Sequence, residues 1–448
     1  MSNRVTTKTI FKSVLTLGSS QGLIVICSLV RAKIVAMLLG PTATGLFAVF
    51  NNVVDVVGGV TRIDLRRVAQ REISRAGNRT VIEAVLRISW MLGLAGGLIM
   101  VVLSPLISKI TFANLDMTFQ ISALGFALIA LSLQEGYYSV MTGCGDTKRF
   151  ALSQVLGALI GLSVSIPLFI YLGLNSIVPS IIVYSVASAL IARYFVRINL
   201  LSGITMKWRE AIQTMIPALK FGLWITVAAF ITRACDYCFL AWMTNEWTID
   251  TVGIYSAGST MISRGAGLIL AALAADYYTR VSAISNDDSD NLNHLVRRQV
   301  NVLLSIAVPC LIVFVLFAKS FVTLFYSTEY LPVVPYLTGA SASVVVKVAS
   351  WALAFVILSR GAGKIYLLSE TISAFVGLAI DIMSFKFGGL ELLGYATLVN
   401  EIIYLIIVSI VCRRYSVRLR VKEGMIILLS AILIILSGLI EKITIFAM

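Results

Sequence analysis

Eight basic residues interrupt long apolar runs of the sequence, and the four taken as the deepest come from both halves of the chain: Lys33, Arg233, Arg264 and Lys347. At about 1.5 Å of rise per helical residue, Lys33 lies roughly 10 Å, Arg233 roughly 15 Å, and Arg264 and Lys347 roughly 20 Å from the outer ends of their runs. A charge at such depth in a membrane is costly and marks a functional residue. Fixed cations in a medium of low dielectric match a diphosphate or an acidic sugar. We therefore predict that these four side chains line one cavity and bind an anionic substrate.

Acidic residues lie in the same runs, and Asp55, Asp236 and Glu401 are candidates for ion coupling or gating. The chain has no nucleotide-binding motif, so an ion carried by an intramembrane carboxylate is the expected source of energy. Asp236 follows Arg233 at i,i+3 spacing, which leaves a structural ion pair as an alternative for these two residues. Lys33 has no acid three or four residues away on its own helix, which favours substrate contact there.

Enzymatic motifs are missing from the sequence. The only histidine, His294, is predicted to lie in a cytoplasmic loop beside Asp287, Asp288 and Asp290, so no histidine-based metal site or acid–base pair is available. Cys235 and Cys238 form a C-x-x-C without a second pair of metal ligands, which indicates a structural role. There is no P-loop and no G-x-S-x-G. We predict a protein that is not an enzyme and needs no cofactor and no metal.

The elements that must position these residues are membrane helices. The chain has 448 residues, of which 58% are hydrophobic and 13% charged, with a mean hydropathy of +0.94. Apolar runs of about twenty residues or more match a hydrocarbon core about 30 Å thick, and no ten-residue alternating segments of a barrel occur. The fold class predicted is an all-α polytopic membrane protein. The predicted spans are 9–39, 44–68, 81–108, 117–142, 149–172, 177–197, 212–243, 250–283, 294–318, 332–358, 363–386, 391–412 and 424–440.

Lysine and arginine gather in alternate loops on one side of these spans. The other side carries only Lys109, Lys319, Lys386 and Lys442. The positive-inside rule then places the N-terminus in the cytoplasm. The net charge of +14 is explained by this topology, so we expect no nucleic-acid partner.

An internal repeat divides the chain. The segment GDTKRFALSQVLGALIGL at 145–162 aligns without a gap to GAGKIYLLSETISAFVGL at 361–378, with 7 of 18 positions identical. This predicts two six-helix lobes, residues 1–200 and 201–413, related by a pseudo-two-fold axis along the membrane normal, with a substrate cleft between them. Residues 424–448 are predicted to form an additional thirteenth transmembrane segment that leaves Met448 outside.

Several joints between spans carry a resemblance to a known family. Lys33-x6-Gly40-Pro41-x3-Gly45 at the first joint resembles the Wzx-type O-antigen and polysaccharide flippases of the multidrug/oligosaccharidyl-lipid/polysaccharide (MOP) exporter superfamily. So do Asp236 followed by Val252-Gly253-Ile254-Tyr255, and the paired joints at 145–152 and 358–364. The resemblance covers roughly residues 9–412.

The resemblance implies a flippase of the bacterial cytoplasmic (inner) membrane that moves an undecaprenyl-diphosphate-linked oligosaccharide from the cytoplasmic to the outer leaflet. It implies alternating access, coupling to an ion gradient, a cationic lumen, and the polysaccharide polymerase machinery as a partner besides membrane lipid. On matched positions Lys33 corresponds to a lumen cation and Asp236 to a lumen acid.

Two alternatives remain open. A multidrug or small-metabolite antiporter of the same superfamily would favour an acid where helix 1 has Lys33. A membrane enzyme of polysaccharide assembly would need a larger polar domain than the short outer loops provide.

Overall fold

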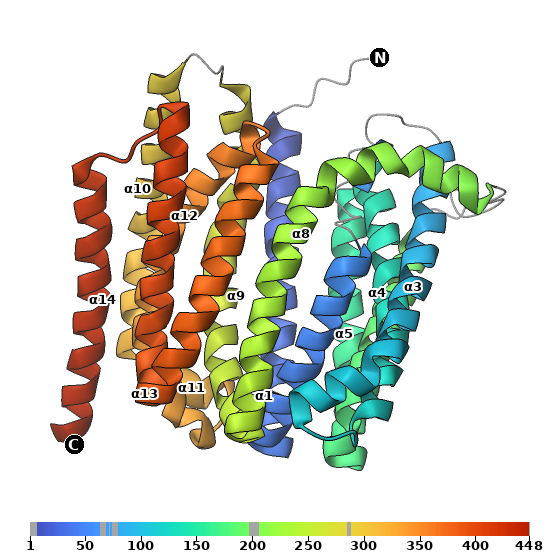
Figure 1. Cartoon of the computed structure of the whole chain (residues 1–448), viewed down its shortest axis with the longest axis horizontal. Helices are drawn as coiled ribbons and strands as arrows, with labels where there is room; N and C mark the ends of the chain where they lie inside the picture. The colour runs from blue at the N-terminus through green and yellow to red at the C-terminus, as the bar shows by residue number, and fades with distance from the viewer. Residues whose placement is uncertain are drawn as a thin grey trace. The chain divides into compact units, whose positions relative to one another are not determined.

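The computed structural model describes residues 7–62, 69–70, 72–73, 79–196, 206–284 and 288–447. Within these residues the regular structure is entirely helical, as Figure 1 shows, so the predicted all-α class is confirmed. The contacts between residues divide the chain into two compact units, Met1–Ile249 and Asp250–Met448. We describe each unit by itself.

The first unit contains α1 (Thr7–Arg62), α3 (Arg79–Phe112), α4 (Thr118–Gly143), α5 (Thr147–Leu172), η1 (Gly173–Ser176), α6 (Ile177–Phe195) and α8 (Trp208–Glu246). The second unit contains α9 (Ile249–Ala283), α10 (Ser289–Leu316), α11 (Ala318–Phe325), η2 (Thr328–Val333), α12 (Val334–Ser359), α13 (Gly363–Cys412), η3 (Arg413–Tyr415) and α14 (Val421–Ala447).

Two of the long helices are broken where the sequence predicts a joint between spans. In α1, Gly40 has φ 72°, a left-handed value that favours glycine, and it is followed by Pro41, which has no N–H to donate. In α13 the break falls at Gly388 and Gly389, and Gly389 has φ 59°. Each long helix therefore supplies two of the predicted spans.

Eight segments of the described residues are long and apolar enough to cross a membrane. Three of them, with 40, 49 and 53 residues, are long enough to hold two crossings each. They are Ser20–Gly59, Thr147–Phe195 and Gly363–Tyr415. The third contains the predicted pair at 363–386 and 391–412, and the first two contain most of the pairs at 9–39 and 44–68 and at 149–172 and 177–197; residues 63–68 and 197 lie outside the described part. The predicted spans 212–243 and 250–283 are the helices α8 and α9. The chain is a multi-pass membrane protein.

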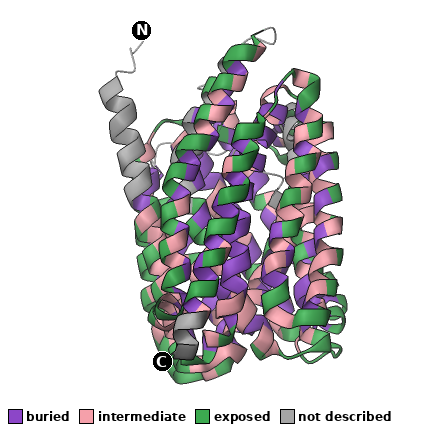
Figure 2. Ribbon diagram, turned by 90° about the vertical axis from the view of Figure 1, so that its left-hand side faces the viewer, coloured by how far each residue is buried: buried purple, intermediate pink, exposed green. Residues whose placement is uncertain are grey.

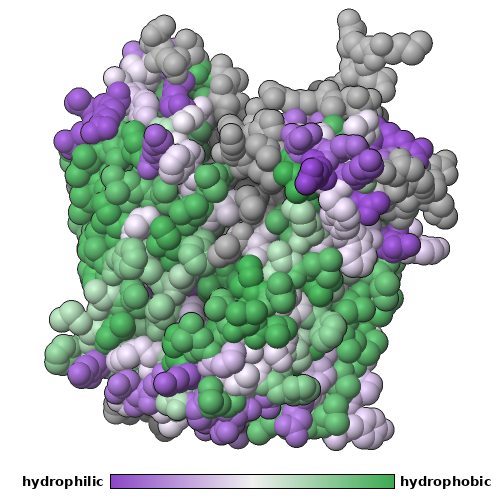
Figure 3. All heavy atoms as spheres, turned by 45° about the vertical axis from the view of Figure 1, so that its right-hand side comes forward, coloured by the Kyte–Doolittle hydropathy of each residue, from purple (hydrophilic) through white to green (hydrophobic). Residues whose placement is uncertain are grey.

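The burial pattern fits helices that face lipid on one side and each other on the other. Buried and exposed residues alternate around the helices in Figure 2. On the face shown in Figure 3, hydrophobic side chains cover the middle of the helices and hydrophilic ones gather toward the helix ends. Large apolar residues such as Leu98, Val102 and Phe126 are about two-thirds exposed, which suits contact with lipid.

Small residues bring the helices of each unit close together. A Cβ added to Gly125 of α4 would lie 3.0 Å from the carbonyl oxygen of Gly97 in α3. In the second unit, a Cβ added to Gly339 of α12 would lie 2.3 Å from the carbonyl carbon of Gly394 in α13. Close packing at small residues is how membrane helices associate when burial of apolar surface gives no advantage over lipid.

The sequence repeat is also a structural repeat at the joints that carry it. After α4, Gly145 has φ 75°, its N–H bonds to Thr142 O at 3.1 Å, and the N–H of Asp146 bonds to Met141 O at 2.8 Å. After α12, Gly361 has φ 71°, with bonds from its N–H to Leu358 O at 3.0 Å and from Ala362 N–H to Ile357 O at 3.2 Å. Both are Schellman caps, which require a left-handed residue just after the helix.

The predicted thirteenth span, 424–440, lies within α14, whose residues Val421–Lys442 are long and apolar enough to cross a membrane. α14 packs against α10 and α12. A Cβ added to Gly438 would lie 2.4 Å from Thr338 Cγ2 of α12, so a glycine is needed where the helices meet. Met448 lies outside the described residues.

Candidate functional site

We name the contact between Arg233 of α8 and Asp55 of α1 the α1–α8 site; the predicted residues Lys33 and Asp236 lie on the same two helices. Arg233 is exposed, and its Nη1 donates a hydrogen bond of 3.4 Å to the backbone carbonyl oxygen of Asp55. The same side chain lies over Gly59, because a Cβ added there would be 3.9 Å from Nη1. The side chain of Arg233 thus reaches from α8 to the part of α1 that follows the break at Gly40.

The alternative of an ion pair between Arg233 and Asp236 is not realised. In the part of the chain that the structure describes, Arg233 has no carboxylate oxygen within salt-bridge range. Asp55 and Asp236 are exposed and Lys33 is half-buried, and each of the three has a polar partner. Among the described residues, the partner of the Arg233 guanidinium is therefore a neutral backbone carbonyl, and its positive charge is not neutralised by a carboxylate.

The C-terminal part of α8 is fixed to α3 beyond this site. Asn245 Nδ2 donates to the carbonyl oxygen of Ile110 at 2.6 Å. The hydroxyls of Tyr237 and Thr111 also share a hydrogen bond. These contacts hold the helix while Arg233 and Asp236 remain exposed on it.

Arg31, next to the predicted Lys33, has surroundings that the sequence did not indicate. Its guanidinium lies 4.7 Å from the centre of the Phe47 ring and 4.8 Å from that of Tyr184. Its Nη2 donates to the carbonyl oxygen of Ser180 at 3.3 Å and to Ser180 Oγ at 3.4 Å. No carboxylate among the described residues pairs with it. Aromatic faces stabilise a cation without neutralising it, so Arg31 joins α1 to α6 and keeps its charge.

The second unit holds a different arrangement, the α12–α13 cluster, formed by Lys347, Ser350, Glu370, Glu401 and Tyr404. Lys347 Nζ lies 3.0 Å from Glu401 Oε1, and Ser350 Oγ donates to Glu401 Oε2 at 3.3 Å. From Tyr336 to Ser350 every residue is buried except Lys347, whose side chain is 50% exposed. The predicted cation Lys347 and the predicted acid Glu401 therefore form one ion pair.

Ser350 and Tyr404 of this cluster were not predicted, whereas Glu370 is one of the acids of the apolar runs. The Tyr404 hydroxyl donates to Glu370 Oε1, which joins the two halves of α13 across the break at Gly388 and Gly389. The signal in the sequence was weak: Tyr404 lies three residues after Glu401, so both point to the same face of the helix.

Arg264, the remaining predicted cation, is exposed on α9 in the second unit. The expectation that all four cations line one cavity involves both units and stays a prediction. His294 and the C-x-x-C cysteines also lie in helices: His294 in α10, and Cys235, buried, and Cys238, exposed, in α8. Both cysteines are free thiols.

The sequence of the chain matches a known protein family. The model of the family described as polysaccharide biosynthesis protein matches residues 33–335, well over half of the chain. The chain belongs to this family. No curated protein matches the sequence.

Solved structures share the fold. An inward-facing multidrug resistance MATE family transporter of the MOP superfamily superposes with a TM-score of 0.68 at 15% identity, covering 90% of this chain and 98% of that one. The lipid II flippase MurJ in an inward closed conformation gives 0.66 at 13% identity, covering 98% and 99%. A MOP superfamily transporter from Pyrococcus furiosus gives 0.61 at 15% identity, covering 90% and 96%.

These similarities confirm two predictions. The two-lobe helical fold is that of MOP superfamily transporters, and the resemblance to polysaccharide exporters agrees with the family match. The three structural neighbours named above are two transporters and a flippase.

Proposed function

We propose that this member of the polysaccharide biosynthesis family is a flippase. Its substrate is an undecaprenyl-diphosphate-linked oligosaccharide, an O-antigen or related repeat unit, which it moves from the cytoplasmic to the outer leaflet by alternating access. Arg233 supports this proposal best, because its guanidinium is exposed at membrane depth and has no acidic partner among the described residues. A diphosphate that enters such a site gains charge-assisted hydrogen bonds that replace its lost hydration.

The likeness to MurJ suits a lipid-linked substrate, since that protein is a lipid II flippase. The lobes of this proposal are residues 1–200 and 201–413, with the substrate between them. Lys33 would contact the diphosphate from the first lobe, and Arg233, Arg264 and Lys347 from the second. The orientation puts the N-terminus in the cytoplasm of a bacterium and Met448 outside its inner membrane, with the polysaccharide polymerase machinery as a partner.

Coupling to an ion gradient is part of the proposal. Asp55, Asp236 and Glu401 are the carriers proposed, and Glu401 has the clearest mechanism. When Glu401 binds a proton, the attraction between its carboxyl group and the Lys347 ammonium 3.0 Å away weakens. Lys347 then attracts an anion more strongly, so proton binding and substrate binding are linked through this ion pair.

A multidrug or small-metabolite antiporter is the second candidate, because MATE transporters share the fold at a similar TM-score. The two candidates differ in what accumulates when the protein is absent. Deletion of the gene should remove surface polysaccharide and leave lipid-linked repeat units on the cytoplasmic side. Normal surface polysaccharide together with increased drug sensitivity would reject the flippase and support the antiporter.

A further inference from the structure

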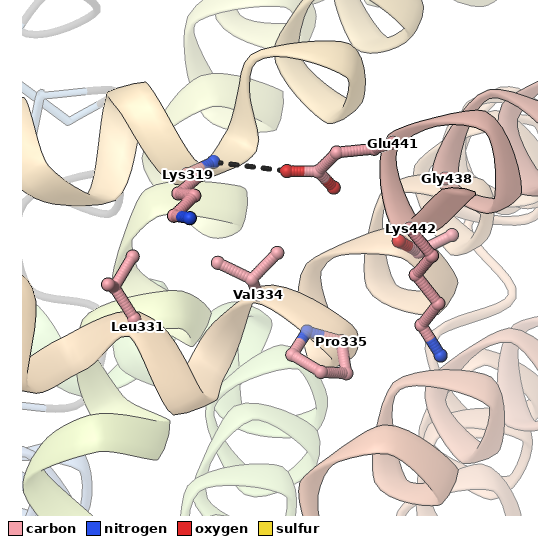
Figure 4. A pocket seen from close by; sticks show the side chains of 8 residues that line it. Lys319, Leu331, Val334, Pro335, Gly438, Glu441 and Lys442 are labelled. Carbon is pink, nitrogen blue, oxygen red and sulfur yellow. Dashed lines mark hydrogen bonds between the residues drawn. The ribbon is translucent and has the colours of Figure 1, made fainter. Parts of the chain in front are cut away.

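A cavity of about 280 Å³ lies between α14 and the α11–η2–α12 segment of the second unit, apart from the α12–α13 cluster (Figure 4). Its lining consists of Lys319, Leu331, Val334, Pro335, Thr338, Gly438, Glu441 and Lys442. In Figure 4 the α14 residues face Lys319, Leu331 and Val334 across the pocket.

The pocket lies where apolar helices end. The candidate span Ser289–Leu316 ends three residues before Lys319, and the span Thr328–Ser359 begins three residues before Leu331. Two span ends and the charged residues Lys319, Glu441 and Lys442 meet at this pocket, as expected at the level of lipid headgroups, next to the hydrocarbon core.

The lining of the pocket is apolar on one side and charged on the other. Leu331, Val334 and Pro335 give it an apolar side. The polar side carries both signs of charge: Lys319 and Lys442 are cations, and the Glu441 carboxylate accepts the backbone N–H of Lys319 at 3.3 Å. Lys442 also forms an ion pair with Glu391 of α13.

We propose that this pocket binds the headgroup of a zwitterionic aminophospholipid, phosphatidylethanolamine. The lysine ammonium groups would contact the lipid phosphate, the second oxygen of Glu441 would accept from the lipid ammonium, and an acyl chain would follow Leu331 and Val334 into the membrane. A cavity just below the about 300–1,000 Å³ of whole-ligand sites suits a headgroup.

Charge complementarity selects this lipid over others at the same level. Phosphatidylcholine has the same charges, but its quaternary ammonium has no N–H to donate to Glu441. Phosphatidylglycerol and an undecaprenyl diphosphate have no ammonium and place only negative charge beside the carboxylate. The inference does not depend on the proposed transport substrate, since it concerns a peripheral pocket.

The test uses the purified full-length chain in detergent, stripped of lipid and titrated with dioleoyl phosphatidylethanolamine, phosphatidylcholine or phosphatidylglycerol, with bound lipid counted by native mass spectrometry. We expect phosphatidylethanolamine to bind about tenfold more tightly than the other two, the equivalent of one charge-assisted hydrogen bond. Glu441→Gln keeps an acceptor for the Lys319 N–H but loses the charge, and should abolish this preference.

Two further variants separate the pocket from general lipid adhesion. Val334→Phe fills the apolar side and should weaken all three lipids, whereas Lys386→Ala, which removes an exposed lysine of α13 that does not line the pocket, should change nothing. Equal binding of the three lipids to the unaltered chain, or an unchanged preference in Glu441→Gln, would overturn the proposal. So would tighter binding of undecaprenyl diphosphate than of phosphatidylethanolamine, which would identify a substrate subsite instead.

Discussion

The α1–α8 site and the α12–α13 cluster differ in the partner that each provides for an intramembrane cation. In the first unit, Arg233 contacts a backbone carbonyl and Arg31 lies between two aromatic rings, so both keep their charge. In the second unit, Lys347 is paired with Glu401 at 3.0 Å. Among the described residues, the first region therefore has cations without a carboxylate partner. The second has a cation, Lys347, whose ion pair weakens when Glu401 is protonated.

The backbone repeat does not explain this difference. Gly145 and Gly361 close the same type of helix cap with the same hydrogen-bond pattern, after α4 and after α12. The α12–α13 cluster lies on the helices of the second joint, whereas the α1–α8 site lies on α1 and α8, outside the first. The contrast therefore reflects the side chains of each region, in keeping with the rule that function lives in sites and not in folds.

The largest effect should follow removal of the Arg233 charge. Arg233→Ala should lower surface polysaccharide about 100-fold, because the diphosphate loses a charge-assisted hydrogen bond in a medium of low dielectric. Lys33→Ala should act in the same direction. The measurement is surface polysaccharide in a deletion strain complemented with each variant, normalised to the protein in the membrane.

The control for this prediction is Arg209→Ala, an exposed arginine at the start of the same helix α8. It should transport normally. Full activity of both Arg233→Ala and Lys33→Ala would refute a cationic site in the first unit.

A smaller effect is expected from substitution of Glu401, the ion-pair partner of Lys347. Glu401→Gln should lower gradient-driven translocation about tenfold, to the rate seen without a gradient, because the amide cannot bind and release a proton. The measurement is flipping of a fluorescent lipid-linked oligosaccharide in vesicles, with and without ionophore. Glu329→Gln, an exposed carboxylate of η2, is the matched control.

The double variant Lys347→Met/Glu401→Gln distinguishes coupling from stability. If Glu401 only balances the charge of Lys347, the double variant should recover the thermal stability that Glu401→Gln loses, since replacing both partners by neutral groups leaves no unpaired charge. If Glu401 carries the proton, the double variant should fold well and remain uncoupled. Gradient-dependent transport in the Glu401→Gln, Asp55→Asn and Asp236→Asn variants alike would show that none of the three acids is the carrier.

Arg31 should influence folding more than transport. Arg31→Met loses two ring contacts and the bond to Ser180, and should lower the free energy of unfolding by about 2 kcal/mol. A thermal-shift measurement in detergent checks this, with Arg149→Met at the exposed start of α5 as control. Unchanged stability together with lost transport would move Arg31 into the substrate site.

The helices could be predicted from the sequence because the membrane fixes their length. The thickness of the hydrocarbon core sets the length of the apolar runs. Gly40-Pro41 and Gly388-Gly389 are dipeptides of the kind that break helices. The pairing of side chains could not be predicted in the same way. Lys347 and Glu401 are on different helices, and the partner of Arg233 is a backbone carbonyl, which no residue type reveals. Such contacts depend on the rotation of each helix, and apolar runs without a polar face do not define it.

The smallest effect should come from the one element that follows the repeated helices, α14. It contacts α10 and α12 of the second unit, and its buried residues Ile427, Ala431 and Ile434 join the core there. Removing Gly424–Met448 exposes that surface to acyl chains, which are as apolar as the side chains they replace. We therefore expect the truncated chain to flip substrate within about twofold of the full chain, because the α1–α8 site and the α12–α13 cluster are retained. The measurement is the vesicle assay above, together with labelling of a cysteine at position 448 of the full chain, which should react only from outside. Loss of flipping in a truncated chain that still folds would show that α14 takes part in transport and that the two-unit comparison is incomplete.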